Sequence, residues 1–123
     1  MMVCALALGF PVQSASQAPE LPVIREIGEI HHLDREAAVR GYPVDAQGVV
    51  TYFDPYGPDF FVQGKTGGVW VEWLPSMPKP VVGELISLQG VTTQRDFSPD
   101  VVQARWQVLG TAPMPKPLKP AYA

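Results

Sequence analysis

The residues with the clearest capacity for chemistry are the adjacent pair His31 and His32. Imidazoles bind zinc and other transition metals when several ligands converge on one ion. Neighbouring residues on a helix point about 100° apart, so this pair cannot readily share a metal. Glu29 and Asp34 lie nearby, but the spacing matches no known metal-binding motif. We therefore expect one histidine to pack against the protein and the other to be solvated.

Two aspartates, Asp54 and Asp59, flank a turn of sequence Pro-Tyr-Gly-Pro. Paired carboxylates can perform acid–base catalysis or bind calcium. Aspartate is also a common turn former, because its side chain accepts hydrogen bonds from the backbone two residues further on. The sequence has no calcium-loop spacing, so turn formation is the better interpretation of both residues.

Motifs for catalysis or cofactor binding are missing from the sequence, which has no Gly-x-Ser-x-Gly, no P-loop and no Cys-x-x-Cys. Cys4 is the only cysteine, which excludes an intrachain disulfide and a multi-thiolate zinc site. Gly64, Gly67 and Gly68 fall in a hairpin turn rather than before a helix, which argues against phosphate binding. We expect a chain with no enzymatic activity, no catalytic residue, no cofactor and no metal.

A surface that binds without catalysis is predicted around Trp70. Period-two alternation over residues 60–63 and 69–74 turns one set of side chains inward and the other outward. The outward set forms a candidate ligand or interface face made of Phe61, Gln63, Trp70 and Glu72. A base or sugar could stack on Trp70, although the sequence favours cover by the N-terminal helices or by a following domain.

The elements that must position these residues are β-strands. Three β-rich runs, residues 49–53, 60–63 and 69–74, are separated by turns rich in Pro and Gly, which predicts an antiparallel meander. Two further strands are predicted over residues 84–92 and 102–108. The period-two pattern of the first strand begins at Tyr42, and Gly48 lies inside it, where a bend or bulge is expected. Five strands with a bent first strand predict a mainly β fold, a small OB-like Greek-key barrel.

The same alternation assigns an inward side to each strand. In the first strand, Val49, Thr51 and Phe53 are expected on one side, with Val50 and Tyr52 on the other. Later strands are expected to turn inward Phe60, Val62, Val69, Val71, Ile86, Leu88, Val102, Ala104, Trp106 and Val108. We expect a turn at residues 97–100 and the end of the last strand at Gly110.

Two short helices are predicted before the barrel. Apolar positions 24, 27 and 30 and the histidine at position 31 share one face of a helix over residues 24–33. Asp34 is a candidate N-cap for a second helix over residues 36–40, which Gly41 would end. We expect this helical lead-in to pack across one open end of the barrel.

Composition limits the class of protein. The 123 residues suit one domain, and the net charge of -3 argues against a general nucleic-acid binder. Residues 1–18 are typical of a partial secretory signal peptide, with an apolar run that is too short to span a bilayer followed by small residues. The remaining predicted parts are a linker over 19–23, the helical lead-in over 24–41, the barrel over 42–112 and a Pro/Lys-rich linker over 113–123.

A series of motifs in fixed order resembles a known family. The motifs are Leu33-Asp34-Arg35-Glu36-Ala37-Ala38, Tyr42-Pro43-Val44, Gly48-Val49-Val50-Thr51-Tyr52, Phe61-Val62-Gln63, Thr66-Gly67-Gly68-Val69-Trp70-Val71, the run from Gly83 to Thr92, Phe97-Ser98-Pro99 and Val108-Leu109-Gly110. Together they resemble the periplasmic OB-fold-like N-terminal domains of bacterial sensor histidine kinases and diguanylate cyclases, over roughly residues 21–117. The family's usual aspartate after the Val-Gln pair is replaced here by Gly64-Lys65.

The resemblance implies a non-catalytic extracytoplasmic sensory or interaction module of a signal-transduction receptor, in a two-component system or a cyclase. Its implied partners are adjacent domains of a larger receptor and a small-molecule or saccharide ligand. Nucleic acid is not expected, and membrane contact would come only through the parent protein. The same motifs are similar to OB-like accessory substrate-binding modules of secreted nucleases and phosphoesterases. A small secreted oligonucleotide or oligosaccharide binder is the remaining alternative.

Overall fold

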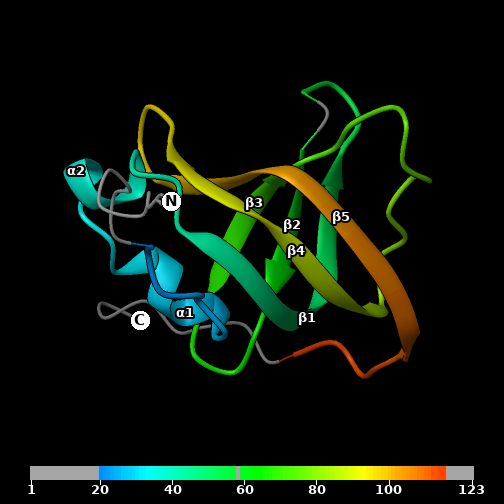
Figure 1. The fold of residues 1–123 in the computed structure, drawn as a ribbon. Helices are drawn as coiled ribbons and strands as arrows, with labels where there is room; N and C mark the ends of the chain where they lie inside the picture. The colour runs from blue at the N-terminus through cyan, green and yellow to red at the C-terminus, as the bar shows by residue number, and fades with distance from the viewer. Residues whose placement is uncertain (1–19, 58, 116–123) are drawn as a thin grey trace, which may run out of the picture.

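The structure, a computed structural model, describes residues 20–57 and 59–115. Two short helices, α1 (Ile27–His31) and α2 (Arg35–Ala38), precede the strands. The five strands are β1 (Pro43–Asp54), β2 (Asp59–Gln63), β3 (Gly68–Glu72), β4 (Glu84–Gln94) and β5 (Pro99–Thr111). They form one sheet in the order β1-β2-β3-β5-β4, which closes into a barrel through pairing of β4 with β1 (Figure 1). The mainly β fold with a short N-terminal helical segment is confirmed.

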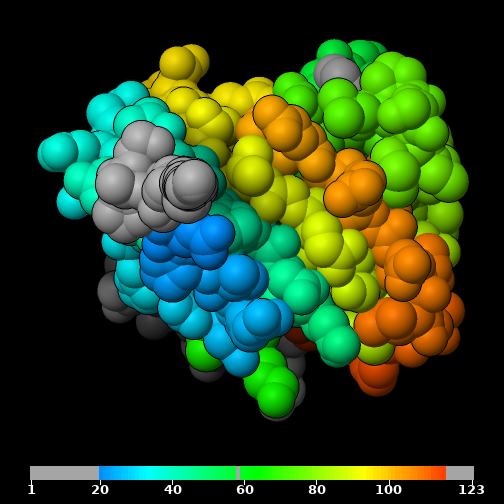
Figure 2. Space-filling model, viewed as in Figure 1, coloured from blue at the N-terminus to red at the C-terminus, as the bar shows by residue number. Residues whose placement is uncertain are grey.

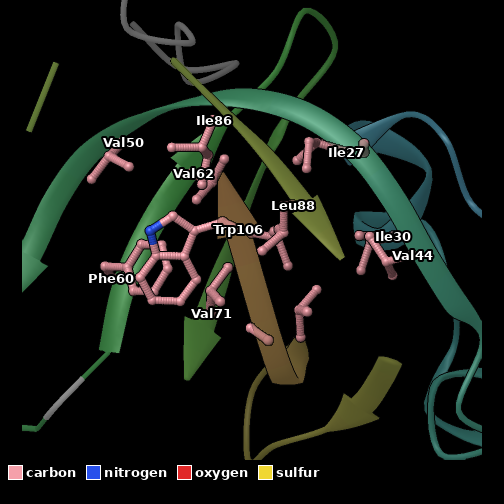
Figure 3. Close-up of a cluster of buried hydrophobic side chains, with 14 of the residues drawn as sticks. Ile27, Ile30, Val44, Val50, Phe60, Val62, Val71, Ile86, Leu88 and Trp106 are labelled. Carbon is pink, nitrogen blue, oxygen red and sulfur yellow. The ribbon is translucent and has the colours of Figure 1, made fainter. Parts of the chain in front are cut away.

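β1 is one long strand that serves two neighbours. Residues 43–49 pair antiparallel with β4, and residues 49–54 pair antiparallel with β2. Gly48 lies beside this change of partner. The ribbon of β1 curves around the core between Val44 and Val50 (Figure 3). The strand begins at Pro43, close to the start of the predicted period-two pattern, and buried Val44 and Ala46 alternate with exposed Asp45 and Gln47. Gly48 thus lies inside the first strand, as predicted.

We expect Gly48→Ala to lower the free energy of unfolding by about 1–3 kcal/mol, as overpacking of a core does. An added Cβ would lie 2.5 Å from Cγ1 of Val62 and 3.0 Å from the carbonyl oxygen of Gln63. Denaturant melts of the variant and the wild type measure the loss. The control is Gly57→Ala, whose Cβ would meet only the Asp54 carboxylate, at 3.3 Å. Equal losses in the two variants would contradict close strand approach as the reason for Gly48.

The core fills the barrel with side chains from all five strands and from α1 (Figure 3). Trp106 lies at its centre against Phe60, with ring centroids 4.8 Å apart. The inward sides predicted for β2, β3 and β4 are confirmed by the burial of Phe60, Val62, Val69, Val71, Ile86 and Leu88. Alternation along the sequence predicted the buried side of these strands correctly, because the extra residues at the register shifts lie in β1 and β5.

Bulges change the alternation in β1 and β5. In β1, Val50 lies in the core, whereas Val49 is buried outside the core cluster, beside Leu85 and Pro113. The pairing of β1 with β2 slips between Val50 and Tyr52, and the predicted alternation ends there, because Phe53 packs against the core while Tyr52 is 52% exposed. In β5, Gln103 adopts a φ of 53°, which is uncommon for a residue other than glycine. Val101 and Ala104, three residues apart, are both fully buried as a result.

Two inward assignments in β5 are therefore wrong. Val102 is only partly buried. Because the backbone is irregular at Gln103, Val101 rather than Val102 points into the core. Val108 is 52% exposed, because β5 beyond Trp106 pairs with β4 alone. Figure 2 shows this part of β5, in orange, at the lower right edge of the molecule.

β5 also begins and ends outside its predicted limits. Pro99 and Asp100 were expected in a turn, but they are the first residues of the strand, and Thr111 rather than Gly110 is the last. Asp100 is drawn into the sheet by parallel pairing with Trp70 of β3, which is followed by pairing of Val101 with Val71. These two pairs form the β3–β5 seam. Tertiary pairing thus overrides the local turn preference of Pro and Asp.

The helices pack at one end of the barrel (Figure 1). α1 is shorter than predicted because Ile24 instead forms a parallel β-bridge with Val44. Ile27 and Ile30 of α1 are buried in the core. Asp34 caps α2 as predicted, accepting a hydrogen bond of 2.8 Å from the backbone N–H of Ala37. α1 thus closes the barrel end next to the β2–β3 turn.

Three predicted terminal segments fall wholly or partly outside the described residues. These are the signal peptide at 1–18, the linker at 19–23, of which residue 19 is not described, and the C-terminal linker at 113–123, of which only 113–115 are described. Over residues 20–57 and 59–115, no helix has the length and apolar character needed to cross a membrane.

Candidate functional site

An aromatic row crosses the outer face of β1, β2 and β3. It consists of Tyr52, Phe61 and Trp70, and the strand register pairs Phe61 with each of the other two. The Trp70 ring centroid lies 5.2 Å from that of Phe61 and 5.9 Å from that of Tyr52, both in edge-to-face geometry. Such contacts fix the orientation of the rings beyond simple burial. The sequence pattern pointed to Phe61 and Trp70 but missed Tyr52.

Gly68 holds the middle of this row in place. It stands opposite Gln63 at the start of β3, and a Cβ there would collide with the Phe61 ring. The ring of Phe61 therefore lies against bare backbone, beside Trp70. The absence of a side chain at the first residue of β3 thus makes room for the Phe61 ring.

Phe61 and Trp70 border a surface hollow of about 270 Å³, which we call the aromatic hollow. Its other walls come from the end of α1, the β2–β3 turn and the start of β5. The residues that complete it are His31, His32, Thr66, Gly67, Gly68, Val69, Ser98 and Pro99. The volume lies near the lower end of the range for small-molecule sites.

His31 and His32 are both exposed, so the prediction that one of them packs into the protein is wrong. α1 ends at His31, and its buried side is occupied by Ile27 and Ile30. The two imidazoles lie edge to face with centroids 6.0 Å apart. Among the described residues, no three His, Cys, Asp or Glu side chains are grouped to hold a metal ion.

A second hollow of about 310 Å³ adjoins the first and shares Trp70 and Ser98 with it. We call it the acidic hollow, because four carboxylates line it. Its remaining lining residues are Asp54, Asp59, Arg95, Asp96, Phe97 and Asp100. Trp70 thus stands between an apolar space and a negatively charged one.

Arg95 organises the acidic hollow. Its Nε lies 3.2 Å from Asp100 Oδ2, its Nη2 3.3 Å from Glu72 Oε2 and its Nη1 3.7 Å from Asp59 Oδ2. These carboxylates come from β5, β3 and β2, so a single guanidinium links three strands. One positive charge cannot offset three negative ones, and negative charge remains in excess.

Asp100 is the most deeply placed of these acids, with its side chain 5% exposed. Burial raises the pKa of Asp100 to about 6, against the opposing attraction of Arg95. Nearby Asp59 and Glu72 contribute further to the rise. Burial also raises the pKa of Asp59, again opposed by Arg95. Both shifts arise chiefly from burial, and neighbouring carboxylates add to them.

The two aspartates that flank the first turn have different roles. Asp54 accepts a hydrogen bond of 2.9 Å from the backbone N–H of Tyr56, so its predicted turn-forming role is confirmed. For Asp59 that role is wrong, because this residue begins β2 and forms an ion pair with Arg95. The pairing joins residues far apart in sequence, so local spacing could not indicate it.

The four residues of the predicted face do not form one patch. Phe61 and Trp70 line the aromatic hollow, whereas Glu72 pairs with Arg95 at the edge of the acidic hollow. Gln63, at the other end of β2, borders a different hollow with Gln47 and Pro113. Trp70 remains only partly buried, because the helices cover the adjoining barrel end instead.

No protein-family model matches the chain, and no curated protein matches it in sequence. The two hollows that meet at Trp70 are therefore the features on which a functional proposal rests.

Proposed function

We propose that this chain is a non-catalytic binding module of the OB type, and that its aromatic hollow receives a ligand. The observation that carries the proposal is the position of Trp70, which is partly exposed on the outer face of β3 between two hollows. OB-folds bind ligands on the face of their second and third strands and with the loops that follow strands one and four. The corresponding loops here contribute Asp54, Asp59 and residues 95–98 to the acidic hollow.

Strand connectivity supports the OB assignment. A single curved strand, β1, pairs with both β2 and β4, and among the five described strands only β3 and β5 pair in parallel. A five-stranded barrel that leaves one short closing contact is the geometry expected of this fold.

We assign the module to an extracytoplasmic sensor of the histidine kinase or diguanylate cyclase type. The support is the ordered series of motifs over roughly residues 21–117. In that setting the module binds a small molecule or an adjacent receptor domain, and binding changes the state of the neighbouring receptor domains. Sequencing the open reading frame beyond Ala123 tests the assignment. A transmembrane helix followed by a kinase or cyclase domain is expected, whereas a hydrolase domain would favour an accessory module of a secreted enzyme.

Accessibility of Trp70 is tested by iodide quenching of tryptophan fluorescence. We expect a quenchable component in the wild type that is lost in Trp70→Phe, because Trp70 is partly exposed while Trp106 is in the core. The matched control is Trp73→Phe, which removes another partly buried indole, whose N–H donates to the Met77 carbonyl at 3.0 Å. An unchanged quenchable fraction in Trp70→Phe would remove the support for a binding face at this residue.

A further inference from the structure

The aromatic and acidic hollows meet at one residue, and this decides what can occupy them together. Trp70 and Ser98 line both spaces, so a molecule that rests on Trp70 reaches apolar walls on one side and carboxylates on the other. We propose that the ligand of this surface is a small organic cation, with an ammonium or guanidinium group attached to an apolar body. The inference rests on the proposed binding function and names the chemical class of its ligand.

The apolar body fits the aromatic hollow. Phe61, Val69 and Pro99 supply apolar walls, and Trp70 supplies an aromatic side chain at the boundary. The space of about 270 Å³ admits a single ring or a short aliphatic chain rather than a folded domain. Apolar contact alone would not distinguish a charged ligand from a neutral one.

Charge makes that distinction. Arg95 already contacts Asp59, Glu72 and Asp100, and it leaves their combined negative charge uncompensated. Asp54 and Asp96 line the same hollow, and neither has an ion pair within the described part of the chain.

Arg35, a second guanidinium beside this hollow, offsets only part of its negative charge. Arg35 reaches the loop after β4, but it donates to the carbonyl oxygen of Asp96, at 3.1 Å, and not to a carboxylate. A cation in the acidic hollow would therefore gain attraction that an alcohol or an anion could not.

Geometry favours an organic cation over a metal ion. Across residues 20–57 and 59–115, the acidic side chains are too dispersed for three of them to ligate one ion. An ammonium or guanidinium group is larger, donates several hydrogen bonds and gains attraction from an adjacent aromatic ring. Trp70 provides such a ring at the edge of the carboxylate cluster.

Proton linkage gives the proposal a second readout. Asp100 has a pKa of about 6, raised by burial, and a bound cation would favour its ionised form. Binding should therefore release protons near that pH and weaken as the pH falls below it. The titratable and charged groups that face Asp100 or border the two hollows are Asp54, Asp59, Glu72, Arg95, Asp96, Arg35, His31 and His32.

The experiment uses three probes of similar size that differ in charge: phenethylammonium, 2-phenylethanol and phenylacetate. Titration near neutral pH is followed by Trp70 fluorescence and by amide chemical shifts. We expect the ammonium to bind about tenfold more tightly than the alcohol, and phenylacetate to bind most weakly. At about pH 5 the preference for the ammonium should shrink, because Asp100 is then mostly protonated.

Two charge-removing variants locate the effect. Asp54→Asn keeps an acceptor for the Tyr56 N–H but removes one charge from the acidic hollow, so it should weaken ammonium binding and leave alcohol binding unchanged. Glu84→Gln removes the same charge at the opposite end of β4 and should change neither. Trp70→Leu should weaken the binding of both the ammonium and the alcohol probe.

The outcomes separate this inference from the function beneath it. If all three probes bind at Trp70 with equal affinity, the binding face stands and the cationic class is wrong. If Asp54→Asn and Glu84→Gln weaken ammonium binding equally, only general charge attraction is present and the proposal is overturned. If no probe affects Trp70 at millimolar concentration, the proposed binding function fails together with the inference.

Discussion

Replacing Trp106 with alanine should destabilise the protein by about 3–5 kcal/mol, the range measured for truncation of buried large aromatics. Trp106 is 8% exposed and packs on Phe60 at the centre of the barrel. Its cross-strand partner on β4 is Leu88, which is fully buried. Truncation would leave a cavity bounded by several strands, and a closed barrel has little freedom to collapse around it. Denaturant melts of variant and wild type measure the loss.

Arg105→Ala is the matched control for this experiment. Arg105 precedes Trp106 on β5 and is exposed, so its removal should change stability by no more than about 0.5 kcal/mol. The pair tests the alternation of β5 after the irregular Gln103. Similar losses in both variants would show that the assigned inward side of β5 is wrong.

Replacing Arg95 with glutamine should lower stability by about 2 kcal/mol at about pH 8, and by much less at about pH 4. The loss arises because Asp100, whose side chain is 5% exposed, would keep its charge without a partner. The value is below the range for a fully buried pair, because Arg95 itself is 40% exposed and screened by solvent.

The pH dependence follows from the direction of the Asp100 shift. Its pKa is about 6 in the folded protein against an ordinary 3.8, so the folded state holds the proton more tightly than the unfolded state. This contribution to stability is fully present below the ordinary pKa and is lost as pH rises through about 6. Without Arg95 the opposing attraction disappears, the pKa rises further and the loss above that pH becomes larger.

Unfolding measured across pH, with two control variants, separates this effect from a general loss of packing. Arg25→Gln removes another guanidinium, one that pairs with Asp45 at 3.1 Å on the exposed surface, and should change stability little. Asp100→Asn should flatten the dependence between about pH 4 and pH 6. A loss in Arg95→Gln that is the same at every pH would contradict the electrostatic explanation.

The strands that the sequence predicted well are those whose burial depends on neighbours within the same segment. Phe60 and Val62 alternate with partly exposed residues because β2 is regular, and the same holds for β3. Bulges defeat such reasoning, because one slipped residue reverses the side that every later residue faces. Nothing local marks Gln103 as irregular, and it lies where the pairing of β5 with β4 shifts register, between Gln89 and Val91.

In the candidate site, too, the part formed by neighbouring segments could be predicted from the sequence and the part formed by distant strands could not. The juxtaposition of Phe61 and Trp70 follows from a short hairpin, so it could be predicted from alternation and one turn. The cluster around Arg95 could not, because it gathers Asp59 and Asp100 from strands that meet only when the barrel closes. The misassigned histidines had another cause. The exact end of a five-residue helix decides whether they are buried, and the sequence does not specify it.

The strand pairs of this barrel differ in how easily they separate, and the β3–β5 seam is the weakest in backbone pairing. It contains only the pairs Trp70–Asp100 and Val71–Val101, whereas β5 is paired with β4 along most of its length. Few backbone pairs join the strands there, and Arg95 adds ion pairs to Glu72 of β3 and Asp100 of β5. Trp70 faces outward at this joint, and the next residue, Val71, is fully buried. A molecule bound on Trp70 would therefore contact the residue next to a core residue, at the junction with the fewest paired residues in the barrel. Local separation of β3 from β5 at this junction would expose Val71 and Val101 of the core.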